Sequence, residues 1–214
     1  MSRKKIIRSH YEPRIAPGRD SHDVLDWSDP AAQQARFEVL VRHVNLSGKS
    51  LLDVGCGLGD LWAFLHARRI PVDYTGVDLL EKMVLAARQK HPAGRFVCAD
   101  VFDGRSLADQ RFDVVFCSGA FNLDLGNNRE FLPRAAARLM ELAREAVMFN
   151  LLHHRTAERH GHCFYYDPAE VQTAMEAIGC NVEIADDYLP NDFTVICRKA
   201  PRAAGGRQGK GKKR

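Results

Sequence analysis

The sequence predicts a single α/β domain with a doubly wound, mostly parallel sheet and helices on both of its faces. Several short runs are continuously apolar rather than alternating, which is typical of parallel strands buried on both faces. Most of these runs are followed by a glycine or an acidic residue and then by a helical pattern, and right-handed crossovers between such units produce a doubly wound sheet. The length of 214 residues and the hydrophobic fraction of 45% suit one domain.

The elements follow one another in a regular order from Asp29-Pro30, where a capping residue precedes a proline at the first helical position. The expected strands are 50–54, 73–77, 95–99, 112–117 and 146–151, and the expected helices are 31–44, 61–68, 81–90, 129–142 and 168–178. Two further strands, 181–185 and 192–197, lie close together in the chain and are predicted to form an antiparallel pair that ends the sheet.

The two ends of the chain differ from this body. Residues 1–28 mix proline, glycine and charges without a period, so we expect an irregular arm that packs over a ligand through Tyr11 or Trp27. The domain proper is expected at 29–200, and 201–214 is expected to be a disordered basic tail. Twelve of the 31 basic residues lie in 1–8 and 198–214, where there is no acidic residue, so the basic character belongs to the ends.

Composition and cysteine usage narrow the class of protein. No apolar stretch is long enough to span a membrane, and the first residues do not form a secretory signal, so we expect a cytoplasmic protein. The six cysteines form no CxxC pair and are interpreted as reduced thiols. A zinc site made of Cys163, His160 and His162 lacks a second ligand pair at metal spacing, so no metal site is predicted.

The segment 51–60 carries the strongest signal for a ligand. Its glycines Gly55, Gly57 and Gly59 follow a buried strand and precede a helix, and ligands of open α/β sheets lie beyond the carboxyl ends of the strands. A dinucleotide fingerprint would have glycine three residues after Gly57, but this chain has Asp60, whose carboxylate opposes a pyrophosphate. The spacing therefore argues against a nicotinamide oxidoreductase.

Acidic residues suit S-adenosylmethionine, which has no phosphate, carries a sulfonium and an ammonium, and offers two ribose hydroxyls. Asp78 ends the second strand, 23 residues after Gly55, close to the offset expected of an acid that binds ribose. The alternative role for Asp78 is to cap the helix that follows it.

Four segments, 51–60, 75–78, 96–101 and 112–122, resemble motifs I to IV of the class I, Rossmann-like S-adenosylmethionine-dependent methyltransferases, and the resemblance covers about residues 30–198. It implies a seven-stranded sheet with an antiparallel last strand and S-adenosylmethionine as the cofactor. Asp78 stands where the family usually has glutamate. The resemblance implies which residues would face each part of the cofactor. The methionyl part would be faced by Asp53, Gly55, Cys56 and Gly57, and the ribose and adenine by Asp78 and Leu79. The adenine amine and ring would be faced by Asp100 and Val101, and the pocket would be completed by Ser118 and Gly119.

The acceptor is predicted to be a small-molecule nucleophile that attacks the methyl group in line. The segment 117–121 is not the Asn/Asp-Pro-Pro-Tyr/Phe sequence that holds planar amines, and no Pro-Cys dipeptide offers a thiolate for pyrimidine C5 methylation. His153, His154 and Asn122 follow strands at the edge used for chemistry and are the candidates for contact with the acceptor or proton removal, with surface or capping roles as alternatives. Arg36 is a candidate for the methionyl carboxylate, with a solvated side chain as the alternative.

Two other functions stay open from sequence alone. The basic ends would bind phosphates, so the chain could be an RNA methyltransferase anchored by its tails, or a protein methyltransferase. It could also be a non-catalytic protein that binds S-adenosylmethionine, because methyl transfer requires no invariant catalytic side chain whose loss would be visible.

Overall fold

The computed structural model describes residues 1–16, 18–27 and 29–199. Its seven-stranded sheet has the strand order β3-β2-β1-β4-β5-β7-β6. The strands are β1 (Ser50–Val54), β2 (Asp73–Asp78), β3 (Phe96–Cys98), β4 (Phe112–Cys117), β5 (Ala143–Leu152), β6 (Asn181–Ala185) and β7 (Asp192–Arg198). The helices are α1 (Arg3–Tyr11), α2 (Ser21–Leu25), α3 (Pro30–His43), α4 (Asp60–Ala67), α5 (Glu81–Lys90), α6 (Asn128–Leu142) and α7 (Pro168–Ala177), with short 3-10 turns at Glu12–Arg14 and Val101–Asp103.

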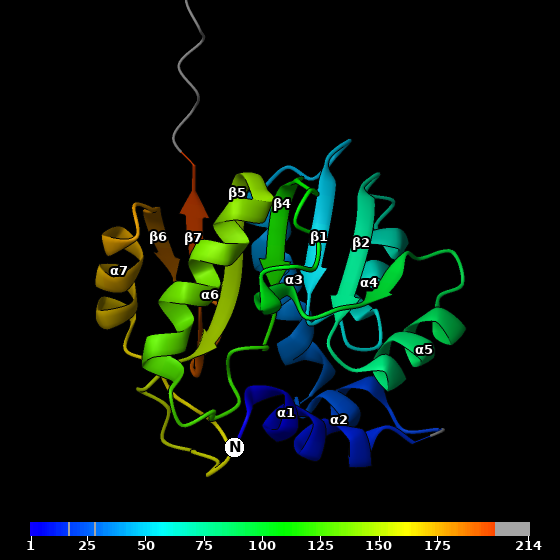
Figure 1. Cartoon of the computed structure of the whole chain (residues 1–214), viewed down its shortest axis with the longest axis horizontal. Helices are drawn as coiled ribbons and strands as arrows, with labels where there is room; N and C mark the ends of the chain where they lie inside the picture. The colour runs from blue at the N-terminus through cyan, green and yellow to red at the C-terminus, as the bar shows by residue number, and fades with distance from the viewer. Residues whose placement is uncertain (17, 28, 200–214) are drawn as a thin grey trace, which may run out of the picture.

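The sheet is parallel from β3 to β5, and β7 pairs antiparallel with both β5 and β6 (Figure 1). This arrangement confirms the predicted doubly wound sheet and its antiparallel end. β6 and β7 form the predicted antiparallel pair, but β7 lies between β5 and β6, so β6 is the edge strand.

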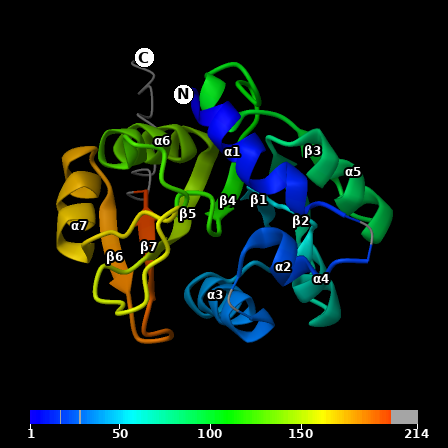
Figure 2. The same ribbon diagram turned by 90° about the horizontal axis from the view of Figure 1, so that it is seen from below.

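Helices cover both faces of the sheet (Figure 2). One face packs against α3, α4 and α5 through a core that contains Leu40, Leu65 and Val84. The other face packs against α6 and α7 through a second core that contains Leu139 and Met175. Each of β1, β2 and β4 contributes apolar side chains to both cores, which explains why their apolar residues do not simply alternate with polar ones.

The helix starts that the sequence predicts are present and have a local cause. The Asp29 carboxylate accepts the Ala32 N–H at 2.8 Å at the start of α3, and the Asp167 carboxylate accepts the Ala169 N–H at 2.8 Å at the start of α7. Each cap is followed by a proline, whose missing N–H is not needed in a first turn. These signals act within one turn, so sequence alone can locate them.

The N-terminal arm is ordered differently from the expectation. Residues 1–28 were expected to be irregular, but they contain α1 and α2, which lie across the carboxyl ends of β1, β2 and β4 (Figures 1 and 2). Val24 is buried there against Leu58, Leu80 and Met83, while apolar side chains of α1 pack at the margin of this cluster. The arm is thus ordered by its contacts with the domain together with contacts between its own elements, such as that of His10 with Asp26.

Two further points concern the whole chain. The expected disordered tail, 201–214, lies outside the described residues. Within the described part of the chain, no helix combines the length and the apolar composition that crossing a lipid bilayer requires.

Candidate active site

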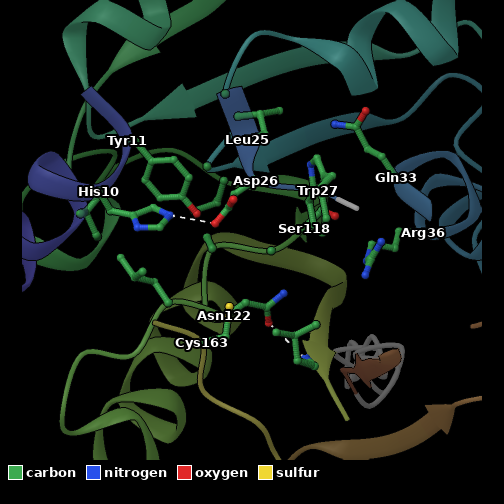
Figure 3. A pocket seen from close by; sticks show the side chains of 18 of the residues that line it. His10, Tyr11, Leu25, Asp26, Trp27, Gln33, Arg36, Ser118, Asn122 and Cys163 are labelled. Atoms are coloured by element: carbon green, nitrogen blue, oxygen red, sulfur yellow. Dashed lines mark hydrogen bonds and ion pairs between the residues drawn. The ribbon is translucent and has the colours of Figure 1, made fainter. Parts of the chain in front are cut away.

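A cavity of about 810 Å³ lies at the carboxyl ends of the strands, lined on one side by residues of α1 and by Leu25 of α2. Its floor includes the glycine loop after β1, and its roof includes Tyr11 and Trp27, the two aromatic residues that the sequence predicts to cover a ligand. Figure 3 shows both side chains in the wall of this cavity. The volume lies within the usual range of about 300–1,000 Å³ for small-molecule sites.

Glycine is needed where the arm touches the floor. Gly57 has a φ of +53°, and a Cβ atom at that position would lie 2.6 Å from Cδ2 of Leu25 in α2. Gly119 has a φ of +77°, and a Cβ atom there would lie 2.6 Å from the Trp27 ring. The left-handed backbone and the close approach of the arm both exclude larger side chains at these two positions.

Asp53 is buried at the end of β1 with its carboxylate on the cavity. The Tyr74 hydroxyl donates a hydrogen bond of 2.6 Å to its Oδ2. Burial raises the pKa of Asp53 to about 7, and the hydrogen bond from Tyr74 offsets only part of that effect. A cationic group of a ligand beside Asp53 would favour the ionised carboxylate.

Asp78 ends β2, and its two oxygens face different backbone donors. Oδ2 accepts the Gly57 N–H at 3.0 Å, and Oδ1 accepts the Leu80 N–H at 2.9 Å. The capping role weighed from sequence is not present, because Leu80 is itself the N-cap of α5 and no side chain caps that helix; Asp78 instead bonds to the N–H two residues further on. Each carboxylate oxygen can accept more than one hydrogen bond, so both remain able to accept from a ligand hydroxyl.

Asp100 and Val101 follow β3 at the next strand end. Val101 is buried, and the Asp100 Oδ1 accepts the Phe102 N–H at 3.0 Å. The guanidinium of Arg3 in α1 pairs with the Asp100 carboxylate and lies 5.2 Å from the centre of the Phe102 ring. The arm therefore contacts the third of the predicted cofactor segments directly.

Two buried polar atoms of the cavity wall have no hydrogen-bond partner among the described residues. They are the hydroxyl of Ser118, which follows β4, and the indole N–H of Trp27. A buried donor or acceptor without a partner costs about 1–3 kcal/mol, so such atoms are expected to bind a ligand or a water. The arrangement fits a ligand with its own polar groups at this point.

Asn122 lies at the far side of the same loop. Its Oδ1 accepts the Leu152 N–H at 3.2 Å, and its backbone carbonyl accepts the Phe164 N–H at 2.8 Å. These contacts fix the side chain so that the Nδ2 group points into the cavity (Figure 3). Asn122 is therefore placed to donate a hydrogen bond to a bound molecule.

Arg36 lines the cavity, but it is not the solvated side chain of the alternative interpretation, because only 2% of it is exposed. Its Nε and Nη2 donate to Asp192 Oδ2 at 3.0 and 2.6 Å, and its Nη1 donates to the Ala32 carbonyl at 2.7 Å. The guanidinium also lies over the Trp27 ring, 4.3 Å from its centre. Three of the five N–H groups of Arg36 are thus used within the protein.

The structure does not bring His153 and His154 to the cavity wall. His153 is buried against Phe193, its Nδ1 accepts the Arg155 N–H at 3.1 Å, and burial lowers its pKa. His154 is exposed and pairs with Asp167 at 3.4 Å. Their position after β5 suggested a base, but β5 continues to Leu152, and the chain then turns both rings away.

Two wall residues escaped the sequence analysis, His10 and Asp26 of the arm. His160, His162 and Cys163 were weighed there only as a zinc site, and together with Tyr165 they line the wall from the segment between β5 and α7. No short motif joins the two groups, since α1 and α2 meet this segment only in the folded chain. The cavity as a whole holds buried carboxylates, backbone N–H groups and aromatic rings, a set that suits a ligand with hydroxyls and a positive charge and fits S-adenosylmethionine.

Comparison with known proteins gives independent information. A family model described as a methyltransferase domain matches residues 51–142. A putative methyltransferase of Mycobacterium tuberculosis is 31% identical over 162 residues, which are 71% of this chain and 93% of that protein. Trans-aconitate 2-methyltransferase of Escherichia coli is 31% identical over 129 residues, and the aligned part spans 57% of this chain and only 50% of that enzyme.

Solved structures share the fold. Magnesium protoporphyrin IX methyltransferase of Synechocystis, with bound S-adenosylhomocysteine, superposes with a TM-score of 0.68 at 18% identity, covering 92% of this chain and all of that one. An O-methyltransferase family protein of Burkholderia thailandensis superposes with a TM-score of 0.69 at 16% identity, covering 93% of this chain and 67% of that one. At such identities the likeness concerns the fold.

Proposed function

This chain belongs to the class I S-adenosylmethionine-dependent methyltransferases, and from that premise we propose that it methylates a small-molecule nucleophile bound beneath α1 and α2. The observation that carries the proposal is the roof of the cavity. The arm covers the strand ends closely enough to contact both Gly57 and Gly119, so the space for an acceptor lies under the roof. A small molecule fits such a space, whereas a folded RNA requires an open surface.

The residues after β1, β2 and β3 are proposed to hold the cofactor. When bound, S-adenosylmethionine supplies an electrophilic methyl group on a sulfonium. Asp53 in its ionised form is proposed to bind the ammonium group of the methionyl part, and Asp78 is proposed to accept from the ribose hydroxyls. Asp100 and Val101 are proposed to bind the adenine, with Arg3 leaving Asp100 when the adenine amine arrives.

The remaining proposed cofactor contacts are made by backbone and small groups. Leu79 follows Asp78 in the wall, and Gly55 and Cys56 form the first turn of the glycine loop. The Ser118 hydroxyl and the Trp27 N–H have no partner among the described residues, so each can bond to the methionyl part or to the acceptor. Arg36 retains two N–H groups for the same purpose, although Asp192 neutralises its charge.

Asn122 is proposed to orient the acceptor. Its Oδ1 is held by the Leu152 N–H, so its Nδ2 donor has a fixed direction and loses little entropy on binding. Apolar and aromatic side chains, including Phe131, Leu125 and Tyr165, complete the wall and exclude water from the nucleophile. The chain's contribution is thus orientation and desolvation, which suffice for in-line methyl transfer to a nucleophile that is already deprotonated.

Relatives support a small acceptor. Trans-aconitate and magnesium protoporphyrin IX are the acceptors named for two of the proteins described above. A cytoplasmic location is part of the proposal and is supported by the free thiols of all six cysteines, which form no disulfide.

The test uses the full chain and S-adenosylmethionine labelled in its methyl group. The labelled cofactor and the protein are incubated with small-molecule, RNA and protein fractions of a cell lysate, and label is counted in each pool. Label in the small-molecule pool that disappears in the Asn122→Ala variant is the expected result. Transfer to the RNA or protein pool alone would overturn the proposed acceptor class, and binding of S-adenosylhomocysteine without transfer to any pool would indicate a non-catalytic binding protein.

A further inference from the structure

Three polar side chains meet in the roof of the cavity, and none of them is among the proposed cofactor contacts. His10 belongs to α1, Asp26 follows α2, and His162 belongs to the segment between β5 and α7. Nε2 of His10 lies 3.1 Å from Oδ2 of Asp26, and Nε2 of His162 lies 2.8 Å from the same oxygen. The two imidazole rings are 4.9 Å apart between centres, and Figure 3 shows His10 and Asp26 facing each other.

We propose that His10, Asp26 and His162 bind a divalent transition-metal ion through the two Nε2 atoms and Oδ2. The three atoms lie within 4.8 Å of one another. Two imidazoles and a carboxylate are a donor set that suits Zn²⁺, Fe²⁺ and similar ions rather than Mg²⁺ or Ca²⁺, which prefer oxygen ligands.

The distances are close to those that such an ion imposes. Bonds of about 2.0–2.1 Å to nitrogen and oxygen place neighbouring ligands of a tetrahedral ion about 3.3 Å apart. The two nitrogen–oxygen separations of 3.1 and 2.8 Å need to grow by only a few tenths of an ångström. Three protein ligands leave at least one coordination position open, as in catalytic rather than structural zinc sites.

Arg14 is placed as an outer partner rather than as a competitor. Its Nη2 lies 3.6 Å from Oδ1 of Asp26, the oxygen that neither histidine contacts, and its Nη1 donates to the His10 carbonyl. It therefore orients the carboxylate and α1 together while Oδ2 stays available, which is the usual arrangement around ligating carboxylates.

The end of α2 brings Asp26 to the two histidines. Asp26 is the C-cap of α2, with a φ of +61°, and its N–H donates to the His22 carbonyl. Helices commonly end on a left-handed residue, and aspartate adopts this conformation more readily than most residues other than glycine. This turn places the Asp26 carboxylate beside both imidazoles.

The ion would lie in the wall of the cavity that is proposed to hold the acceptor, and this part of the inference rests on the proposed function. Its open position would take an oxygen of the acceptor, either a carboxylate or a hydroxyl that releases its proton to water. Such an ion would act as a Lewis acid on the acceptor oxygen, which His153 and His154 cannot assist because neither lines the cavity. The acceptor class it predicts is an oxygen nucleophile.

Metal binding is tested without turnover. The chain is stripped with a chelator and titrated with Co²⁺, followed by its visible absorption, and with Zn²⁺ by calorimetry. We expect one ion per chain, and at least about hundredfold weaker binding in each of the variants His10→Ala, Asp26→Asn and His162→Ala. The matched control is His160→Ala, since its ring lies 5.7 Å from that of His162 in the same wall but does not contact Asp26, and it should keep the affinity of the parent.

Two measurements keep the outcome unambiguous. S-adenosylhomocysteine binding by calorimetry and thermal unfolding report whether each variant is folded with an intact cofactor site, so a failed metal site is distinguished from a failed enzyme. A parent that binds no ion in a saturable way, an Asp26→Asn variant with unchanged affinity, or a sulfur-to-cobalt charge-transfer band that moves the ion to Cys163 would each overturn the proposal.

Discussion

Replacing Tyr74 with phenylalanine should change the pH dependence of cofactor binding. The change removes the hydroxyl that donates to Asp53 and keeps the ring, which packs edge-on against Phe96 at 5.9 Å between centres. The pKa of Asp53 is already raised to about 7 by burial, and the Tyr74 hydrogen bond is the interaction that limits the rise. Without it, the neutral carboxyl is favoured further.

The magnitude follows from the strength of that hydrogen bond. A hydrogen bond to a charged group contributes about 1.5–3 kcal/mol, and 1.36 kcal/mol corresponds to one pKa unit, so the pKa of Asp53 should rise by about one to two units. If only the ionised carboxylate binds the ammonium group, protonation weakens binding about tenfold for each pH unit below the pKa. The variant should therefore bind about ten- to hundredfold more weakly than the parent near pH 6, and nearly as well as the parent near pH 10.

The assay is calorimetric titration with S-adenosylhomocysteine, which keeps the ammonium group, over that pH range. The ratio of the two dissociation constants is taken at each pH, so the ligand's own titration cancels. Tyr166→Phe is the matched control, because it also removes a buried phenol hydroxyl, one that donates to the Phe121 carbonyl, and its ratio should not vary with pH. A ratio for Tyr74→Phe that stays constant, or that grows as the pH rises, would refute the assignment of Asp53.

Three further variants test other contacts. Asp192→Ala should lower the free energy of unfolding in urea by about 3–5 kcal/mol, because Arg36 is left buried without its partner; a loss below about 1 kcal/mol would contradict this. Gly57→Ala should weaken S-adenosylhomocysteine binding about tenfold in calorimetry and speed hydrogen exchange in α2, since its Cβ meets Leu25; unchanged values would count against the close roof. His154→Ala should keep kcat/KM within a factor of about two, whereas a loss of about a hundredfold would make it the base.

The elements that sequence predicts well are those with local causes. β1, β4, β6 and α5 have the expected bounds, because the hydrophobic periodicity of strands and helices is a local signal. β5 begins at Ala143 rather than at residue 146, since α6 passes directly into it with no turn residue between them. The arm was missed because its helices are short and have few buried residues of their own, so they depend on the domain they cover.

The residues of the candidate site also differ in whether a local sequence pattern predicts their position. The strand-end residues Asp53, Asp78 and Asn122 could be placed on the cavity from sequence because parallel strands bring their carboxyl ends to one edge. The pairing of Arg36 with Asp192 joins residues 156 positions apart, and that of His162 with Asp26 joins residues 136 apart. No local pattern encodes such distances, so these contacts required the structure.

The position of β7 has a consequence for how the protein forms. The last strand of the described chain lies between β5 and β6 rather than at the edge of the sheet, so both neighbours have an unpaired side until residues 192–198 are available. During synthesis, α3 is made early, but its Arg36 has no carboxylate to pair with in the folded arrangement before Asp192 emerges. Such late, long-range pairing slows folding, and open strand edges invite association with other chains. A growing chain is therefore most vulnerable to aggregation just before β7 leaves the ribosome.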